Sequence, residues 1–191
     1  MKIDEFYDSV ASEYENIINS PEVNAQLMPK IKEFFIKYNI TEGSILDVGC
    51  GPGNLQSALG NKFTYTGIDV SEKMLFEAKE KGYEVIKGRA EEEITKILDK
   101  SFDYIVSSST LHVVKDLNTV IENFDRVASK GWLITLPDIT KNFIKNFPVD
   151  EPLYNHVNLP ILGVKEDIII RGWTSPSANE DIKERVVLKM F

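Results

Sequence analysis

The sequence has few residues that cross-link or hold metals, with one cysteine, Cys50, and two histidines among 191 residues. A single cysteine excludes an intramolecular disulfide and a cysteine-rich zinc site. No stretch approaches the ~20 consecutive apolar residues of a membrane-spanning helix. The first residues turn acidic at once and lack the apolar segment of a signal peptide. We therefore expect a cytoplasmic protein with no metal site and no membrane association.

Positive charge is also scarce, because the chain has 22 Lys and Arg residues against 30 Asp and Glu residues, which gives a formal net charge of −8. Nucleic-acid binding relies on Lys and Arg to neutralise phosphates, so this balance disfavours a nucleic-acid partner. The hydrophobic fraction of 42% is ordinary for a globular protein. The length suits one domain with a substantial core, and no repeat, low-complexity tract or linker divides the chain.

Short apolar runs alternate with amphipathic stretches through the middle of the chain. The runs predict strands, and the stretches between them have helical spacing. Five such strands separated by helices imply right-handed crossovers and a parallel sheet covered on both faces. The expected strands are 45–48, 63–69, 83–87, 102–106 and 132–136, and the expected helices are 54–59, 71–81, 91–98 and 116–128.

The first 38 residues have a helical pattern instead. Apolar residues recur at spacings of three and four from Phe6 to Ile18, which indicates one buried helical face. Ser20 followed by Pro21 predicts the start of a second helix, because serine caps helices and proline suits the first helical position. Pro29 is a potential break or kink in that helix.

The last third of the chain departs from the alternation. Four prolines interrupt residues 137–163 and leave one weak helix at 139–147. Residues 167–174 and 184–190 have the composition of strands. The segment between these strands is too short for a crossover helix, so we expect an antiparallel hairpin.

The stretch from Ile45 to Asn54 is a buried strand that runs into a turn with three glycines. Glycines there remove side chains where a ligand must touch backbone, which suits a nucleoside cofactor. The pattern is Gly-x-Gly-x-Gly, and Pro52 has no N–H to offer a pyrophosphate. Asp69 follows Gly49 by 20 residues at the end of the next strand, where its carboxylate can accept hydrogen bonds from ribose hydroxyls. A nucleoside cofactor without phosphates fits this pattern best.

The chain resembles the class I S-adenosylmethionine-dependent methyltransferases of the small-molecule type, from Phe6 to about Leu136. Five segments carry the resemblance in the family's order, namely residues 6–15, 47–53, 67–71, 88–91 and 102–106, the last together with Leu111-His112. The resemblance implies a doubly wound, mostly parallel seven-stranded sheet with helices on both faces and a C-terminal antiparallel strand pair, a Rossmann-like methyltransferase fold. It also implies transfer of a methyl group from S-adenosylmethionine to a small-molecule acceptor, with S-adenosylhomocysteine as product.

Within that family pattern the chain forms a single domain with three parts. Residues 1–42 correspond to an N-terminal helical cap, and residues 43–136 to the cofactor-binding core. Residues 137–191 correspond to an acceptor-side region and the hairpin. The acceptor itself cannot be read from the sequence.

The resemblance also assigns cofactor-binding roles. The backbone at Gly49 and Gly51 would lie beside the methionine portion and the ribose, and Asp47 would hold the ammonium group. Asp69 would bind the ribose hydroxyls, and Val70 and Met74 would flank the adenine. Ala90 would donate its amide to an adenine ring nitrogen, and Ser107 would lie near the methionine end. The remaining residues of the set are Tyr7, Tyr14, Cys50, Gly53, Arg89 and Glu91.

Arg89 departs from the family pattern, which usually has an acidic residue at that position to accept from the adenine amino group. An arginine has no acceptor atom. We therefore expect that contact to come from Glu91 or to be absent.

Three side chains have two interpretations each. Tyr7 and Tyr14 share one helical face, and the residues either pack in the core or cover the cofactor. His112 follows the fourth strand, where an acceptor would dock, and it is the candidate general base. The other interpretation of His112 is local packing or hydrogen bonding.

Other functions remain open at this level. One alternative is a non-catalytic protein that binds S-adenosylmethionine or S-adenosylhomocysteine. Others are a protein or nucleic-acid methyltransferase and a nicotinamide oxidoreductase on a similar sheet. A metal-dependent catechol enzyme is disfavoured because no clear set of carboxylate ligands follows the fourth and fifth strands.

Overall fold

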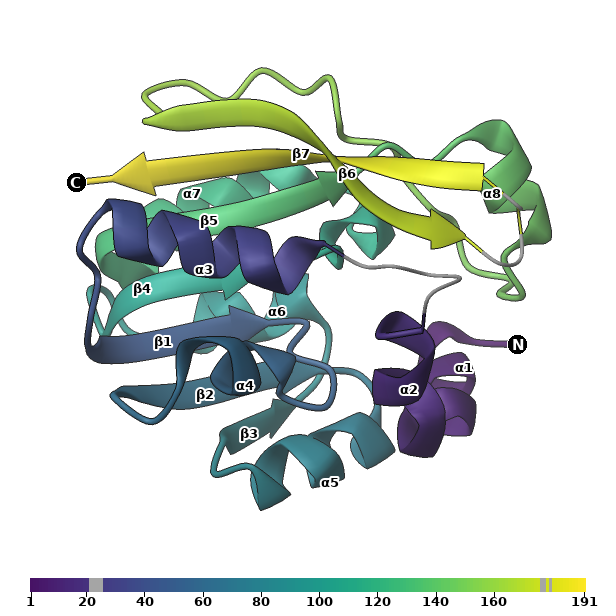
Figure 1. The fold of residues 1–191 in the computed structure, drawn as a ribbon, viewed down its shortest axis with the longest axis horizontal. Coiled ribbons are helices and arrows are strands. Elements are labelled where there is room, and N and C mark those ends of the chain that lie inside the picture. Colours follow the sequence, from purple (N-terminus) through teal and green to yellow (C-terminus); the bar gives the residue numbers. More distant parts are fainter. Residues whose placement is uncertain (21–25, 176–177, 179) are drawn as a thin grey trace.

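A seven-stranded sheet with the order β3-β2-β1-β4-β5-β7-β6 forms the centre of the computed structural model (Figure 1), which describes residues 1–20, 26–175, 178 and 180–191. Strands β1 to β5 run parallel to one another, and β7 runs antiparallel to both β5 and β6. This arrangement confirms the predicted fold class and hairpin. The strands are β1 Gly43–Val48, β2 Phe63–Asp69, β3 Glu84–Lys87, β4 Phe102–Ser107, β5 Ala128–Pro137, β6 Glu166–Ser175 and β7 Glu180–Met190.

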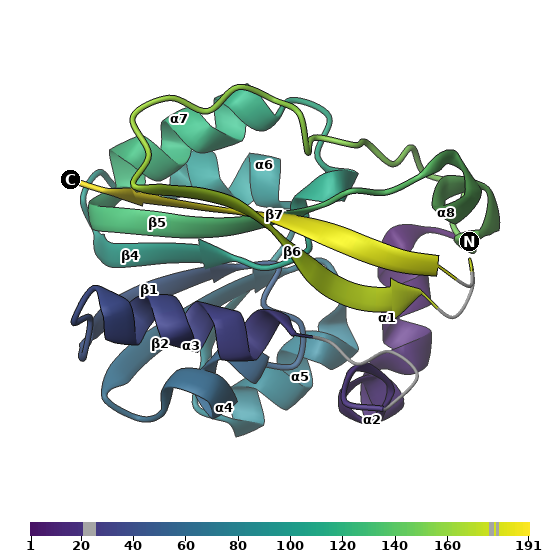
Figure 2. The ribbon, with the colours of Figure 1, turned by 45° about the horizontal axis from the view of Figure 1, so that its top comes forward.

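Helices cover both faces of the sheet (Figure 2). On one face lie α3 (Leu27–Lys37), α4 (Asn54–Leu59) and α5 (Glu72–Glu80), and on the other lie α6 (Ala90–Glu93), the 3-10 turn η2 (Ile94–Lys96) and α7 (Leu117–Val127). Successive side chains of a strand point to opposite faces. Ile45 and Leu46 of β1 accordingly belong to separate hydrophobic clusters, one on each face, and both are fully buried. The doubly covered sheet explains the continuous apolar runs of the sequence.

Three helices gather at the end of the sheet toward which the parallel strands point (Figures 1 and 2). These are α1 (Ile3–Val10), α2 (Tyr14–Ile18), which follows the 3-10 turn η1 (Ala11–Glu13), and α8 (Lys141–Asn146). Asp8 of α1 accepts hydrogen bonds from Ser71 Oγ at 2.6 Å and from Lys73 N at 3.1 Å. Ser71 Oγ in turn accepts from Met74 N at 3.1 Å. Asp8 therefore extends the N-cap of α5 and docks the N-terminal helices against it.

The helix predicted to start at Ser20 begins instead at Leu27 in the structure, and residues 21–25 of the prediction lie outside the described residues. Pro29 lies in the first turn of α3, where a missing N–H leaves no intrahelical hydrogen bond unmade. The proline therefore does not break the helix. The helix predicted at 139–147 is present as the shorter α8.

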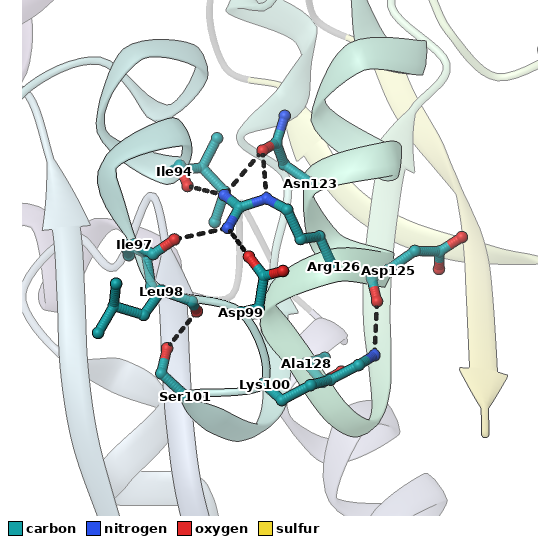
Figure 3. A network of polar contacts seen from close by, with 10 residues as sticks. All are labelled: Ile94, Ile97, Leu98, Asp99, Lys100, Ser101, Asn123, Asp125, Arg126 and Ala128. Carbon is teal, nitrogen blue, oxygen red and sulfur yellow. Dashed lines mark hydrogen bonds and ion pairs between the residues drawn. The ribbon is translucent and has the colours of Figure 1, made fainter.

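The single helix predicted for 91–98 is wrong, because α6 ends at Glu93 and is followed by η2. Figure 3 shows the contacts that hold this segment against α7. The Arg126 guanidinium donates to the carbonyl of Ile94 at 3.0 Å and to that of Ile97 at 2.7 Å. Lys100 Nζ donates to the carbonyls of Asp125 and Ala128 at 2.8 and 2.7 Å. Tertiary hydrogen bonds thus replace the last helical turn.

The attachment of α1 to α5 can be tested by replacing the carboxylate that makes it. We expect Asp8→Ala to expose the first 20 residues to limited proteolysis while most of the domain stays folded, because hydrogen bonds to a charged group contribute about 1.5–3 kcal/mol. The measurement is the cleavage rate followed by mass spectrometry. Glu13→Ala changes an exposed carboxylate of the same segment and serves as the control. Equal cleavage rates in the two variants would contradict the role of Asp8.

Candidate functional site

The turn after β1 is held against β2 by backbone hydrogen bonds. Gly49 N and Cys50 N both donate to the carbonyl of Ile68, at 2.7 and 3.1 Å. Gly49 has φ +74°, and a Cβ there would lie 2.2 Å from Oγ1 of Thr110. Gly51 has φ +51°, and a Cβ there would meet nothing within 4 Å. The turn therefore requires glycine at the first position and leaves open space beside the backbone at the second.

That open space belongs to a cavity of about 500 Å³ at the carboxyl ends of β1, β2 and β4. The strand order reverses between β1 and β4, and such a switch point is where open α/β sheets bind ligands. The cavity brings together most of the residues predicted from the sequence. It is lined by Tyr7, Tyr14, Asp47, Gly49, Cys50, Gly51, Asp69, Val70, Met74, Arg89, Ala90, Glu91 and His112.

Asp69 links the glycine turn to the start of α5. Its two carboxylate oxygens accept from Gly51 N and Ser71 N, each at 2.9 Å. A carboxylate offers about four lone-pair positions, so about two remain for a ligand. Burial raises the pKa of Asp69. The residue therefore has a structural role and retains acceptor capacity toward the cavity.

Asp47 has an exposed fraction of only 3% and still lines the cavity. The hydroxyl of Tyr83 donates to its Oδ2 at 3.0 Å. Burial raises the pKa of Asp47 to about 7. A cationic ligand group beside this carboxylate would favour its ionised form, because opposite charges stabilise each other strongly when they are removed from water.

Gly53 and Ser107 lie outside the cavity lining as far as the described residues define it. Gly53 has φ +79° at the N-cap of α4, and a Cβ there would lie 3.0 Å from the ring of Tyr83. The hydroxyl of Ser107 is buried and donates to the carbonyl of Val48 at 2.8 Å. Strand β4 extends one residue further than predicted, so the residue at its end supports β1, and Ser108 lines the cavity in its place.

Arg89 forms an ion pair with Glu151 at the rim of the cavity. The other carboxylate oxygen of Glu151 accepts from Ile3 N at 2.9 Å. This contact joins three parts of the chain, the turn between β3 and α6, the first turn of α1 and the segment after α8. The departure from the family pattern at Arg89 thus coincides with a clasp between the core and the N-terminal helices.

His112 lies in the 3-10 turn η3 (Leu111–Val113) after β4, and its side chain is buried at the cavity wall. Neither imidazole nitrogen has a hydrogen-bond partner among the described residues. Burial lowers the pKa of His112 to about 4, so the ring is neutral at pH 7. Buried polar atoms are nearly always hydrogen-bonded, which makes an unpaired imidazole in a cavity a candidate contact for a ligand.

Glu184 of β7 is a buried carboxylate that the sequence analysis did not single out. Its Oε1 accepts from Ser109 Oγ at 2.7 Å and from the indole of Trp173 at 3.1 Å, while Oε2 has no partner among the described residues. Ser109 and Trp173 both line the cavity. A Cβ on Gly172 would lie 2.3 Å from Cγ of Glu184, so glycine makes room for the carboxylate at a register shift in β6. The available signal was alternation, since Glu184 shares a strand face with buried Ile182 and Val186.

Six aromatic rings line one continuous side of the cavity, and four of them were not predicted. Tyr7 and Tyr14 were predicted from the sequence, and their ring centroids lie 6.2 Å apart. The chain of neighbouring rings continues through Phe6 at 5.2 Å, Phe147 at 5.0 Å, Phe143 at 5.1 Å and Trp173 at 5.7 Å. We call these six residues the aromatic wall. It combines residues of α1, α2, α8 and β6, so no local sequence pattern could reveal it.

The sheet and its switch-point cavity define a Rossmann-like α/β protein. Residues 46–135 match a family described as a methyltransferase domain. The chain is 32% identical over 127 residues to the demethylmenaquinone methyltransferase of Staphylococcus aureus (strain MRSA252), covering 62% of this chain and 52% of that protein. It is 27% identical over 174 residues to the demethylmenaquinone methyltransferase of Oceanobacillus iheyensis, covering 84% and 72%. These similarities support a class I S-adenosylmethionine-dependent methyltransferase, the class that the sequence motifs indicate.

A solved structure gives the same fold. The magnesium protoporphyrin IX methyltransferase of Synechocystis PCC 6803, crystallised with bound SAH, superposes with a TM-score of 0.68 at 16% identity, covering 98% of this chain and 97% of that chain. The chain thus shares the fold of that solved structure, and it spans about half the length of its Staphylococcus relative. Among the described residues, no helix is long and apolar enough to cross a membrane.

The buried carboxylate of Glu184 predicts a pH-dependent stability. Burial raises the pKa of Glu184 from 4.5 to about 7. The stability it contributes is therefore complete below about pH 4.5 and is lost as the pH rises through about 7. Relative to wild type, Glu184→Gln should gain about 2–3 kcal/mol in the free energy of unfolding between pH 5 and pH 8. Urea titrations at each pH measure the difference. Glu80→Gln, at an exposed site, is the control, and a pH-independent difference for Glu184→Gln would refute the prediction.

Proposed function

We propose that this chain binds S-adenosylmethionine in the cavity and transfers its methyl group to a small-molecule acceptor. The observation that carries the proposal is the Asp69 carboxylate, which is fixed by the glycine turn and has acceptor positions left in the cavity. The net charge of −8 favours a small acceptor over nucleic acid. The relatives and the structural neighbour are named for small molecules, demethylmenaquinone and magnesium protoporphyrin IX. The cytoplasmic location expected from the sequence stays a prediction.

The lining residues fit the cofactor. The remaining acceptor positions of Asp69 suit the two ribose hydroxyls, and the open space beside Gly51 lets a ligand approach the backbone. We assign Asp47 to the ammonium group because this buried carboxylate lacks a cationic partner in the described residues. Val70 and Met74 are assigned to the adenine, with the amide of Ala90 and the carboxylate of Glu91 at its polar edge. Gly53 and Ser107 support the glycine turn after β1 from outside the cavity lining, and Cys50 packs within the turn.

The proposed division of the chain follows from these assignments. Residues 43–136 supply the cofactor-binding core. From the predicted cap of residues 1–42, helices α1 and α2 exclude water from the cavity, whereas α3 packs on a face of the sheet. Residues 137–191 supply the acceptor side. Tyr7 and Tyr14 line the cavity from the cap, where aromatic faces favour a nearby positive charge.

When bound, S-adenosylmethionine supplies a methyl group on a positively charged sulfur, and the electron pair of the broken carbon–sulfur bond stays on that sulfur. The chain has to position the acceptor and to take up any proton that the acceptor releases. His112 is the residue we assign to that proton, because its imidazole is neutral, buried and unpaired at the cavity wall. The same unpaired imidazole favours a methyltransferase over the alternative of a cofactor-binding protein without turnover.

The cofactor assignment predicts a large effect at Asp69. Asp69→Ala should weaken the binding of S-adenosylhomocysteine by about 1–3 kcal/mol, because polar partners in the site are left unmade. Isothermal titration calorimetry measures the affinity directly and needs no acceptor. Glu72→Ala removes an exposed carboxylate three residues away and should leave the affinity unchanged. An unaltered affinity of Asp69→Ala would remove this residue from the site.

The general-base assignment predicts a selective loss of turnover. His112→Ala should lower kcat by about 100-fold or more and leave S-adenosylhomocysteine affinity unchanged, since proton transfer typically contributes that much. Added imidazole should restore part of the rate. His156→Ala removes the other histidine of the chain and is the matched control. Turnover is followed as S-adenosylhomocysteine release with a panel of small acceptors, and an undiminished kcat would rule His112 out as the base.

A further inference from the structure

We propose that the acceptor is an uncharged aromatic ring compound that carries a hydroxyl group. The inference rests on the proposed function, because it concerns the part of the cavity that the cofactor assignment leaves free. That part is lined by the aromatic wall, which includes residues of α1, α8 and β6, and by residues of η3. Its lining decides which molecules can bind there.

The aromatic wall favours a flat ring. Its far half consists of Phe6, Phe147, Phe143 and Trp173, with successive ring centroids 5.0–5.7 Å apart. Most of these contacts are edge-to-face, whereas Phe143 and Phe147 are stacked. Aromatic pairs at such distances contribute beyond the area they bury, so a ligand ring placed against this surface gains the same kind of contact. The apolar side chains of Ile3 and Val113 also line the cavity.

The lining provides no counter-ion for an acidic acceptor. Arg89 is the only Lys or Arg among the lining residues that the structure describes, and its charge is paired with Glu151. The eight residues outside the description, 21–25, 176–177 and 179, include no Lys or Arg in the sequence. Moving a carboxylate or phosphate from water into such a cavity without a partner is strongly unfavourable. This lining therefore disfavours an anionic acceptor, and we take the acceptor to be uncharged because its site is mostly apolar.

Among the polar residues of the lining, His112 has both ring nitrogens without a partner in the described residues, and this imidazole selects a hydroxyl. A neutral imidazole nitrogen accepts a hydrogen bond from an O–H group. An amine nitrogen attacks with its own lone pair, whereas a neutral hydroxyl has to give up its proton as its oxygen bonds to the methyl carbon. That proton passes to the imidazole. The positive charge that leaves the sulfur then appears on the imidazolium, so the proton transfer to His112 leaves the net charge of the cavity unchanged.

Matched naphthalene probes test the acceptor class by binding. The protein is first titrated with S-adenosylhomocysteine in a calorimeter, and the saturated complex is then titrated with 2-naphthol, with 6-hydroxy-2-naphthoate and with 2-naphthylamine. We expect 2-naphthol to bind at least about tenfold more tightly than the carboxylate, which corresponds to about 1.4 kcal/mol. With S-adenosylmethionine in place of the product, mass spectrometry should detect the methyl ether of naphthol in excess of N-methylnaphthylamine.

The outcomes separate this inference from the proposed function. If S-adenosylhomocysteine does not bind, the first titration shows it and both proposals fall. If it binds but 2-naphthol does not, or if the carboxylate binds as tightly, the acceptor class is wrong while the cofactor assignment stands. A preference for methylating the amine would also overturn the inference.

A variant of the aromatic wall checks that the probe occupies this part of the cavity. Phe147→Leu keeps an apolar side chain but removes the ring that contacts Phe6 and Phe143. We expect about 3- to 10-fold weaker naphthol binding, the size of one or two aromatic contacts. Affinity for S-adenosylhomocysteine should be unchanged. Phe76→Leu, at an exposed ring of α5, is the control and should change neither. Equal naphthol affinity in the two variants would contradict the placement.

Discussion

The architecture of the site depends on the hydrogen bonds of one carboxylate. Asp69 at the end of β2 accepts from the glycine turn after β1 and from the start of α5. Ser71, two residues later, caps α5 and also bonds to Asp8 of the N-terminal cap. Backbone N–H groups at strand and helix ends need partners when they leave the solvent. By meeting that need at one point, Asp69 fixes the relative positions of the sheet, the helix and the cap, and it still retains acceptor capacity.

The sequence predicted the parts that depend on local order. Apolar periodicity located the strands, and the glycine spacing with Asp69 located the cofactor side of the cavity. The exact end of a strand was not predictable. Strand β4 is one residue longer than expected, so Ser108 lines the cavity at the place predicted for Ser107. The aromatic wall and Glu184 were missed because their contacts join residues far apart in the chain, such as Phe6 with Phe147. Such contacts become visible only when the sheet is assembled.

Burial shifts three titratable groups in and beside the cavity toward their uncharged forms. Burial raises the pKa values of Asp47 and Glu184 to about 7 and lowers that of His112 to about 4. Each shift has the same cause, since removal from water disfavours the charged form. A ligand group that supplies a positive charge or a hydrogen-bond donor can therefore pair with one of these carboxyl or imidazole groups. The two ends of the cavity differ in their lining side chains. Carboxylates lie at the glycine turn, and aromatic rings lie on the proposed acceptor side.

The clasp between Arg89 and Glu151 has a thermodynamic consequence. Arg89 lies beside the adenine end of the assigned cofactor site, while Glu151 follows α8 and its C-cap residue Phe147, and these supply two rings of the aromatic wall. A ligand that orders one side of this ion pair favours the ordered form of the other. Coupling between two binding equilibria is reciprocal, so any factor by which the cofactor raises the affinity for the acceptor is also the factor by which the acceptor raises the affinity for the cofactor. Two sites built from residues more than 60 positions apart in the sequence would then share one coupling free energy.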